Sequence, residues 1–200
     1  MTKSGSMGIA TLAGGLALLA SGPALAHTGH GDAHGVLTGL AHPFSGLDHI
    51  LAMVAVGLWA AQMGRQALWL LPLVFPAVMA LGGAVGMAGW ALPGVEIGIA
   101  LSSVVLGLMV LGKVQLPALA ASLLVGVLAV FHGFAHGAEL SASTSGLQYA
   151  AGFVIGTLVL HLIGAGVGSV HRNKAMEVVL RGLGAGIAAG GALFLSAAAG

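Results

Sequence analysis

Long apolar segments, separated by short polar or Pro- and Gly-containing breaks, run through almost the whole chain. A helix needs about 20 mostly apolar residues to cross the hydrocarbon core of a bilayer. The sequence therefore predicts an all-α, polytopic membrane helix bundle with about six transmembrane helices. The six spans are expected at about residues 44–63, 67–91, 95–112, 116–138, 146–169 and 175–197.

The composition supports this fold class. Hydrophobic residues make up 58% of the 200 residues and charged residues 6%, whereas a soluble domain carries about 25% charged residues. The formal net charge of +1 gives nucleic-acid binding no electrostatic support. The chain has no Cys, which excludes disulfides, thiolate metal sites and iron–sulfur clusters. Nine His are a large number for a chain with so few polar residues.

The first residues have the features of a secretory signal peptide. Lys3 precedes an apolar run that closes with Ala-Leu-Ala at Ala26, the small-residue pattern of a cleavage site. The alternative is a retained first helix. We expect a signal peptide over 1–26 and a six-helix transmembrane domain over 27–200, in which 27–41 is a His-rich, exported N-terminal segment.

The basic residues favour one orientation. Cleavage after Ala26 would leave the mature N-terminus outside the cytoplasm, so that alternate loops would face inward. Those loops contain Arg65, Lys113, Arg172 and Lys174, and the other loops contain no Lys or Arg. This is the distribution that the positive-inside rule requires. We therefore expect a multi-pass protein of the bacterial inner membrane with a periplasmic mature N-terminus.

Glycines at four-residue spacing predict close contacts between helices, because small residues let two backbones approach. The spacing occurs in three of the expected spans, at Gly82/Gly86, Gly164/Gly168 and Gly182/Gly186/Gly190.

The first group of polar residues stands at the start of the first span, in the segment HPFSGLDH. Ionisable residues inside a membrane are costly and often functional. We predict that His42, Asp48 and His49 belong to a metal site. The alternative is that Ser45 caps the helix and Asp48 completes a capping box, which leaves both histidines unexplained.

The second group ends the fourth span, in FHGFAHGAE. His132, His136 and Glu139 recur at i, i+4 and i+7 and so lie on one helix face. Two imidazoles one turn apart, with a carboxylate beyond, can hold one divalent ion. The alternative is a pair of histidines hydrogen-bonded between helices. Imidazole with carboxylate suits nickel, cobalt and zinc.

Other polar residues are more scattered. His161 lies deep in the fifth span and is either a further ligand or a structural hydrogen-bonding residue. Glu96 and Glu177 each begin a span, where a carboxylate complements the helix dipole. After cleavage, His27 would offer an amine and an imidazole with His30 nearby, as a capture site outside the membrane. A flexible polar tail is the alternative.

With these motifs, the chain resembles the HupE/UreJ family of hydrogenase and urease accessory membrane proteins. The resemblance rests on the two segments, at 42–49 and 131–139, the signal peptide and the six short-looped spans, and it covers essentially the whole chain. The family is regarded as nickel permeases, sometimes with cobalt. The resemblance implies that metal is handled by His42, Asp48 and His49 of the first motif and by His132, His136 and Glu139 of the second.

We therefore expect an uptake permease for Ni²⁺, or for Co²⁺, that supplies metal for hydrogenase or urease assembly. Its partners would be the divalent ion (Zn²⁺ is a further candidate), the lipid bilayer and metalloenzyme maturation proteins. No enzymatic activity, prosthetic group or nucleic acid is expected. The main alternative is a non-transporting membrane metal sensor or chaperone-like accessory protein. A di-iron oxygenase would need more buried histidines, and an exporter differs only in the direction of flow.

Overall fold

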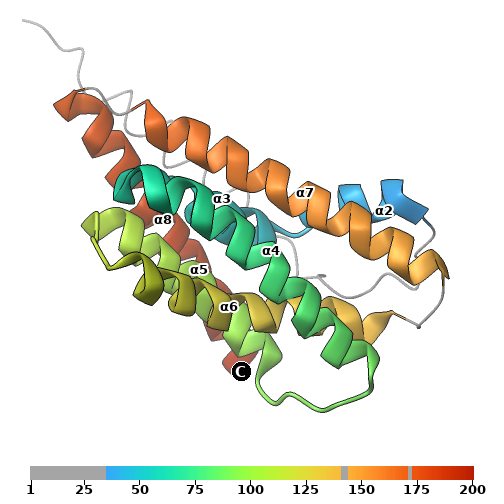
Figure 1. Cartoon of the computed structure of the whole chain (residues 1–200). Coiled ribbons are helices and arrows are strands. Elements are labelled where there is room, and N and C mark those ends of the chain that lie inside the picture. The colour runs from blue at the N-terminus through green and yellow to red at the C-terminus, as the bar shows by residue number, and fades with distance from the viewer. Residues whose placement is uncertain (1–34, 141–143, 171–172) are drawn as a thin grey trace, which may run out of the picture. The chain divides into compact units, whose positions relative to one another are not determined.

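A computed structural model describes residues 35–140, 144–170 and 173–200, and within these ranges all regular secondary structure is helical (Figure 1). The predicted signal peptide and the segment 27–34 lie outside the described residues. The elements are α2 (Gly35–Ala41), η1 (His42–Phe44), α3 (Leu47–Met63), α4 (Arg65–Met87), α5 (Val95–Gly112), α6 (Ala118–Glu139), α7 (Thr144–Ser169) and α8 (Lys174–Ala199).

Five of these helices, α4 to α8, are each long and apolar enough to cross a membrane. The sixth span is broken, because α3 has only 17 residues and reaches membrane length only with α2 and η1, from which it is bent by 81°. The prediction of about six spans in an all-α, multi-pass membrane protein is therefore confirmed. The expectation of one continuous helix over 44–63 is wrong.

The break has a local cause in the first motif. Pro43 lies in the short 3-10 helix η1, and Gly46 then adopts an extended backbone conformation before α3 begins at Leu47. The hydroxyl of Ser45 donates to the carbonyl of His42 at 2.7 Å, and no side chain caps α3. The capping box built on Ser45 is therefore wrong, and Asp48 is left to bond elsewhere.

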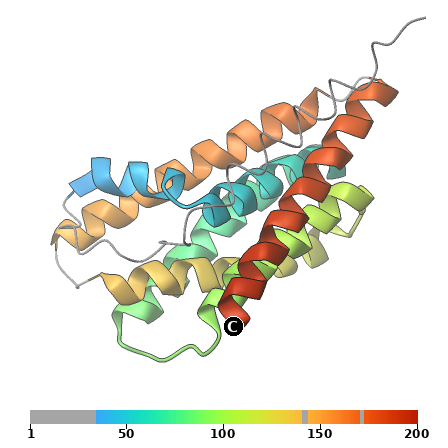
Figure 2. The same ribbon diagram turned by 180° about the vertical axis from the view of Figure 1, so that it is seen from behind.

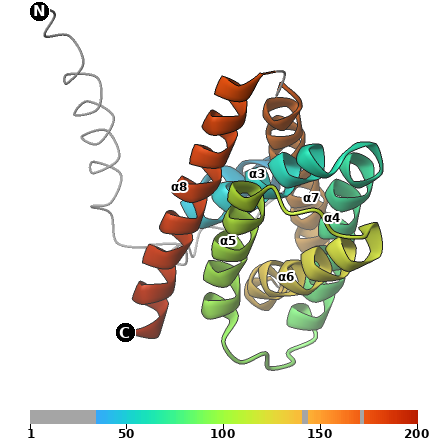
Figure 3. The same cartoon turned by 90° about the vertical axis from the view of Figure 1, so that its left-hand side faces the viewer.

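The helices pack in pairs: α4 lies parallel to α6, α2 and α3 lie parallel to α7, and α5 lies antiparallel to α8. Figures 2 and 3 show α5 and α8 side by side along their lengths. A Cβ on Gly82 would lie 2.7 Å from the carbonyl oxygen of Val130, and one on Gly86 would lie 2.6 Å from that of Phe134. The glycines of α4 thus let its backbone touch α6, as their spacing predicted.

The same prediction holds for α7 but fails in part for α8. Gly164 and Gly168 meet the backbone of α3, whereas a Cβ on Gly182 or Gly186 would meet nothing within 4 Å. The glycines of α8 that contact α5 are Gly184 and Gly191, and Gly190 meets the side chain of Leu51. The spacing of glycines identifies a helix face that is free of side chains, but it does not show whether that face contacts a neighbouring helix.

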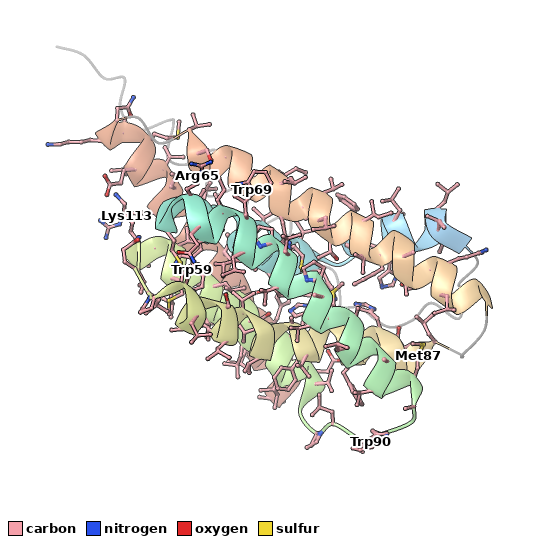
Figure 4. The ribbon with its side chains drawn as sticks, viewed as in Figure 1. Trp59, Arg65, Trp69, Met87, Trp90 and Lys113 are labelled. Carbon is pink, nitrogen blue, oxygen red and sulfur yellow. The ribbon has the colours of Figure 1, made fainter. Side chains whose placement is uncertain are left out.

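The described basic residues gather at one end of the bundle. Arg65 and Lys113 lie at that end, and Trp90 lies at the opposite one (Figure 4). Lys113, which follows α5, forms an ion pair of 3.3 Å with Glu177 in the first turn of α8. The start of α3 and the end of α6, which carry the two motifs, therefore belong to the end away from these cations.

Candidate metal centre

Four histidines from η1, α3 and α6 meet in the interior, and we call them the histidine cluster: His42, His49, His132 and His136. The ring centroid of His49 lies 4.7 Å from that of His136 and 4.9 Å from that of His132. His42 lies 4.8 Å from His136. His42 is half-buried and the other three are buried. The fold thus brings the two sequence motifs, more than 80 residues apart, to one place.

Asp48 fixes the orientation of His49. Its Oδ1 atom accepts hydrogen bonds from the His49 backbone N–H at 2.9 Å and from His49 Nδ1 at 3.0 Å. Because an ionised carboxylate only accepts, Nδ1 carries the hydrogen, and in the neutral imidazole Nε2 carries the lone pair. This carboxylate–imidazole pairing is the arrangement that orients metal-binding histidines in proteins.

Ser102 fixes the orientation of His132 in the same way. The Ser102 hydroxyl donates to the carbonyl of Ile99 at 2.6 Å, so it accepts from His132 Nε2, 2.7 Å away. The lone pair of His132 is then on Nδ1, which is buried and has no hydrogen-bond partner in the described part of the chain. Such an atom is costly without a ligand.

Ser102 was not among the predicted site residues. Its signal in the sequence is modest: with Ser103, it is one of two adjacent serines within the apolar segment 95–112. Nothing in the spacing indicates which of the two faces α6. The structure buries both, but only Ser102 contacts a histidine of the cluster.

Aromatic rings surround the cluster. Phe153 of α7 lies 4.4 Å from His136, Tyr149 lies 5.5 Å from His42, and Phe75 of α4 lies 5.5 Å from His132, between ring centroids. These rings give the imidazoles an apolar surrounding, in which a bound cation would interact strongly with nearby dipoles and charges.

The remaining predicted residues lie elsewhere. Glu139 is the last residue of α6 and is exposed. Glu96 is in the first turn of α5, where its carboxylate complements the helix dipole as expected. His161 is buried in α7, beyond Phe75. His27 and His30 lie outside the described residues.

The cluster is hydrogen-bonded as it stands. His136 Nε2 and His49 Nε2 are 2.7 Å apart, and because His49 presents a lone pair there, His136 donates. This is the interhelical bonding that the alternative interpretation of His136 required. Among the described residues, no three His, Asp or Glu side chains are arranged to hold a metal ion together. Metal–nitrogen bonds of about 2.0–2.1 Å keep two ligand nitrogens roughly 3 Å apart or more, so a bound ion would separate the two rings.

The fold and this centre define a class: a polytopic helical membrane protein with a buried His and Asp cluster between a broken first span and the fourth. A family model described as HupE / UreJ protein matches residues 15–194. The chain belongs to the HupE/UreJ family. It is 49% identical over 163 residues to Protein HupE of Rhizobium leguminosarum bv. viciae, covering 82% of this chain and 85% of that protein. No solved structure matches the chain.

Proposed function

We propose that this protein is an inner-membrane permease that takes up Ni²⁺, with Co²⁺ as an alternative cargo, for the assembly of hydrogenase or urease. Membership of the HupE/UreJ family supports an accessory role of this kind. The observation that carries the proposal is the histidine cluster. Two of its imidazoles, His49 and His132, are held so that their lone-pair nitrogens face the interior.

The donor chemistry fits a borderline divalent ion. Neutral imidazole nitrogens with a nearby carboxylate favour nickel, cobalt and zinc over hard cations such as calcium. The carboxylate of Asp48 supplies negative charge beside the cluster, because it is hydrogen-bonded to His49 Nδ1. Few ligands meet at any one position, so binding stays weak enough for release, which transport requires.

The direction of transport is supported by the charges at the ends of the bundle. The positive-inside rule assigns the end with Arg65 and Lys113 to the cytoplasm, and the cluster then faces the periplasm. His27 and His30 would lie on the same side and capture metal there. An inside-negative membrane potential is worth about 2.3 kcal/mol per charge per 100 mV, and hence roughly 4.6 kcal/mol for a divalent ion.

One observation favours a second candidate function. His49 and His136 are hydrogen-bonded directly to each other. A metal sensor or chaperone-like accessory protein needs only such a binding site and no transport path beyond it. That protein would bind Ni²⁺ with the same residues and would move none across the membrane.

The test is ⁶³Ni²⁺ uptake into bacteria that lack other nickel importers. Wild type, Asp48→Asn and His132→Ala are compared at matched membrane levels, with an empty vector. Glu177→Gln is the control, since Glu177 is a carboxylate at the opposite end of the bundle that pairs only on the surface. We expect uptake by wild type and Glu177→Gln, and at least about a tenfold loss in the two motif variants.

Two other results would overturn the proposal. Wild-type uptake no higher than that of the empty vector would exclude a nickel uptake permease. Binding of ⁶³Ni²⁺ by the purified protein without uptake would establish the second candidate, the non-transporting accessory protein.

A further inference from the structure

His161 is a fully buried polar residue that does not belong to the histidine cluster. Its Nδ1 atom lies 3.3 Å from the carbonyl oxygen of Pro72 in α4. In an uninterrupted helix that carbonyl would accept the N–H of residue 76, but residue 76 is also a proline and has no N–H. His161 therefore satisfies a carbonyl that Pro76 leaves open.

This bond determines the tautomer of His161. A carbonyl can only accept, so Nδ1 carries the hydrogen and Nε2 carries the lone pair. Nε2 is buried and has no hydrogen-bond partner in the part of the chain that the structure describes. Between membrane helices, polar atoms must find partners inside the protein. A lone pair held inward in this way is suited to a cation.

One aromatic ring links His161 to the histidine cluster. The centroid of Phe75 lies 5.3 Å from the ring of His161 and 5.5 Å from the ring of His132. His132 and His161, each with a ring nitrogen that has no hydrogen-bond partner among the described residues, therefore both lie against the ring of Phe75. A cation that leaves His132 meets this ring next.

His161 also lies deeper in the bundle than His132. Both regions contact α4, which gives a common scale. Gly133, next to His132, lies against Met79, whereas His161 lies against Pro72, seven residues and hence about 10 Å closer to the end with Arg65. The step from one histidine to the other therefore runs along the membrane-crossing direction.

The other donors near His161 are neutral. Thr157, one helical turn earlier on α7, is buried, and its hydroxyl lies 4.0 Å from the sulfur of Met79. Hydroxyl, thioether and carbonyl groups stabilise a divalent ion much less than a carboxylate does. A position with one imidazole and such neighbours binds a borderline cation transiently.

We propose that His161 is a second, deeper binding station for the transported cation, filled from His132 past the ring of Phe75. This inference rests on the proposed function and extends it. It assigns Pro76 a role as well, because the missing N–H of Pro76 holds His161 in the ligating tautomer.

The test substitutes His161→Asn in the full-length protein. The amide nitrogen of Asn occupies about the position of Nδ1, so it still donates to Pro72, while nothing replaces Nε2. Bound ⁶³Ni²⁺ per purified chain is measured by equilibrium dialysis, and uptake is measured in cells. Ser169→Ala is the control, because this serine bonds only within α7. We expect His161→Asn to bind one ion fewer than wild type and to lose at least about tenfold in uptake, with Ser169→Ala unchanged.

A second comparison covers the case in which His161→Asn does not accumulate. In Pro76→Ala, residue 76 regains an N–H for the Pro72 carbonyl, so His161 can be removed without leaving that carbonyl open. Pro76→Ala/His161→Leu is then compared with wild type and with Pro76→Ala. The double variant is expected to bind one ion fewer than wild type, whereas Pro76→Ala keeps the imidazole and is expected to bind the same number of ions more weakly.

The outcomes separate this inference from the proposed function. If wild type takes up nickel and removal of His161 changes neither stoichiometry nor uptake, His161 is only a hydrogen-bond donor and the inference is wrong. The same conclusion follows if Asp48→Asn still binds some Ni²⁺ and the double variant Asp48→Asn/His161→Asn binds just as much. If wild type neither binds nor takes up Ni²⁺, the proposed function fails and the inference falls with it.

Discussion

The imidazole of His132 donates its Nε2 hydrogen to the hydroxyl of Ser102, 2.7 Å away, since the hydroxyl's own hydrogen goes to the carbonyl of Ile99. Two other histidines in the interior are each held by a hydrogen bond from one ring nitrogen to a different acceptor. His49 donates to the carboxylate of Asp48, and His161 donates to the carbonyl of Pro72. His132 and His161 thus each have one ring nitrogen occupied by the protein and the other left with its lone pair within the described residues, whereas His49 Nε2 accepts from His136.

Replacement of Ser102 by Ala should reduce metal binding without removing a ligand. His132 would lose the acceptor that fixes its tautomer, and outer-sphere partners of this kind are worth about 10–100-fold in metal affinity. The dissociation constant for ⁶³Ni²⁺ should rise by at least about tenfold, as measured by equilibrium dialysis.

The control for Ser102→Ala is Ser122→Ala. Ser122 lies on α6, and its buried hydroxyl has no partner within the described residues, so its removal should leave binding unchanged. Equal affinities for wild type and Ser102→Ala would show that the tautomer of His132 does not depend on Ser102.

The spans could be predicted from sequence because their cause is local. Hydropathy alone sets where a segment can cross a bilayer, and the segment predicted over 95–112 is the helix Val95–Gly112. The meeting of the two motifs was also predictable, since costly polar residues at similar depth in two spans stabilise each other by contact.

The sequence could not show which residues of a helix face which neighbouring helix. The sequence shows Gly182 and Gly184 equally well, but only tertiary packing turns Gly184 toward α5. Ser102 was missed for the same reason, because its value comes from facing His132. The 81° bend at Pro43–Gly46 was not predicted, because the spans were assigned from the length of apolar segments. Pro and Gly are nevertheless the residues that interrupt helices.

Nickel bound to the purified protein should have only nitrogen and oxygen ligands, at least two of them imidazoles. The composition excludes thiolates, and the cluster offers His49, His132 and His136 at close range. X-ray absorption of the Ni²⁺-loaded protein should show shells near 2.0–2.1 Å with the multiple scattering of imidazole. A sulfur shell, or a shell of oxygen alone, would contradict this assignment and the proposal built on it.

Gly133→Ala should destabilise the bundle, and Gly182→Ala should not. A Cβ on Gly133 would collide with the backbone carbonyl of Met79 in α4, whereas one on Gly182 would meet nothing within 4 Å. Overpacking of this kind costs about 1–3 kcal/mol, and the exposed substitution should be neutral or slightly stabilising. Thermal unfolding in detergent compares the two. Equal melting temperatures would mean that α4 and α6 do not touch at Gly133.

The proposed orientation can be tested by single cysteines, because the chain contains none of its own. Trp90 and Gln66 are both exposed, and Trp90 lies at the end of the bundle opposite Arg65, the neighbour of Gln66 in the chain (Figure 4). A membrane-impermeant maleimide added to intact cells with a permeabilised outer membrane should label Trp90→Cys and leave Gln66→Cys unlabelled. Gln66→Cys should react only after the inner membrane is broken. The reverse pattern would turn the histidine cluster toward the cytoplasm, and the same residues would then serve export or intracellular metal binding instead of uptake.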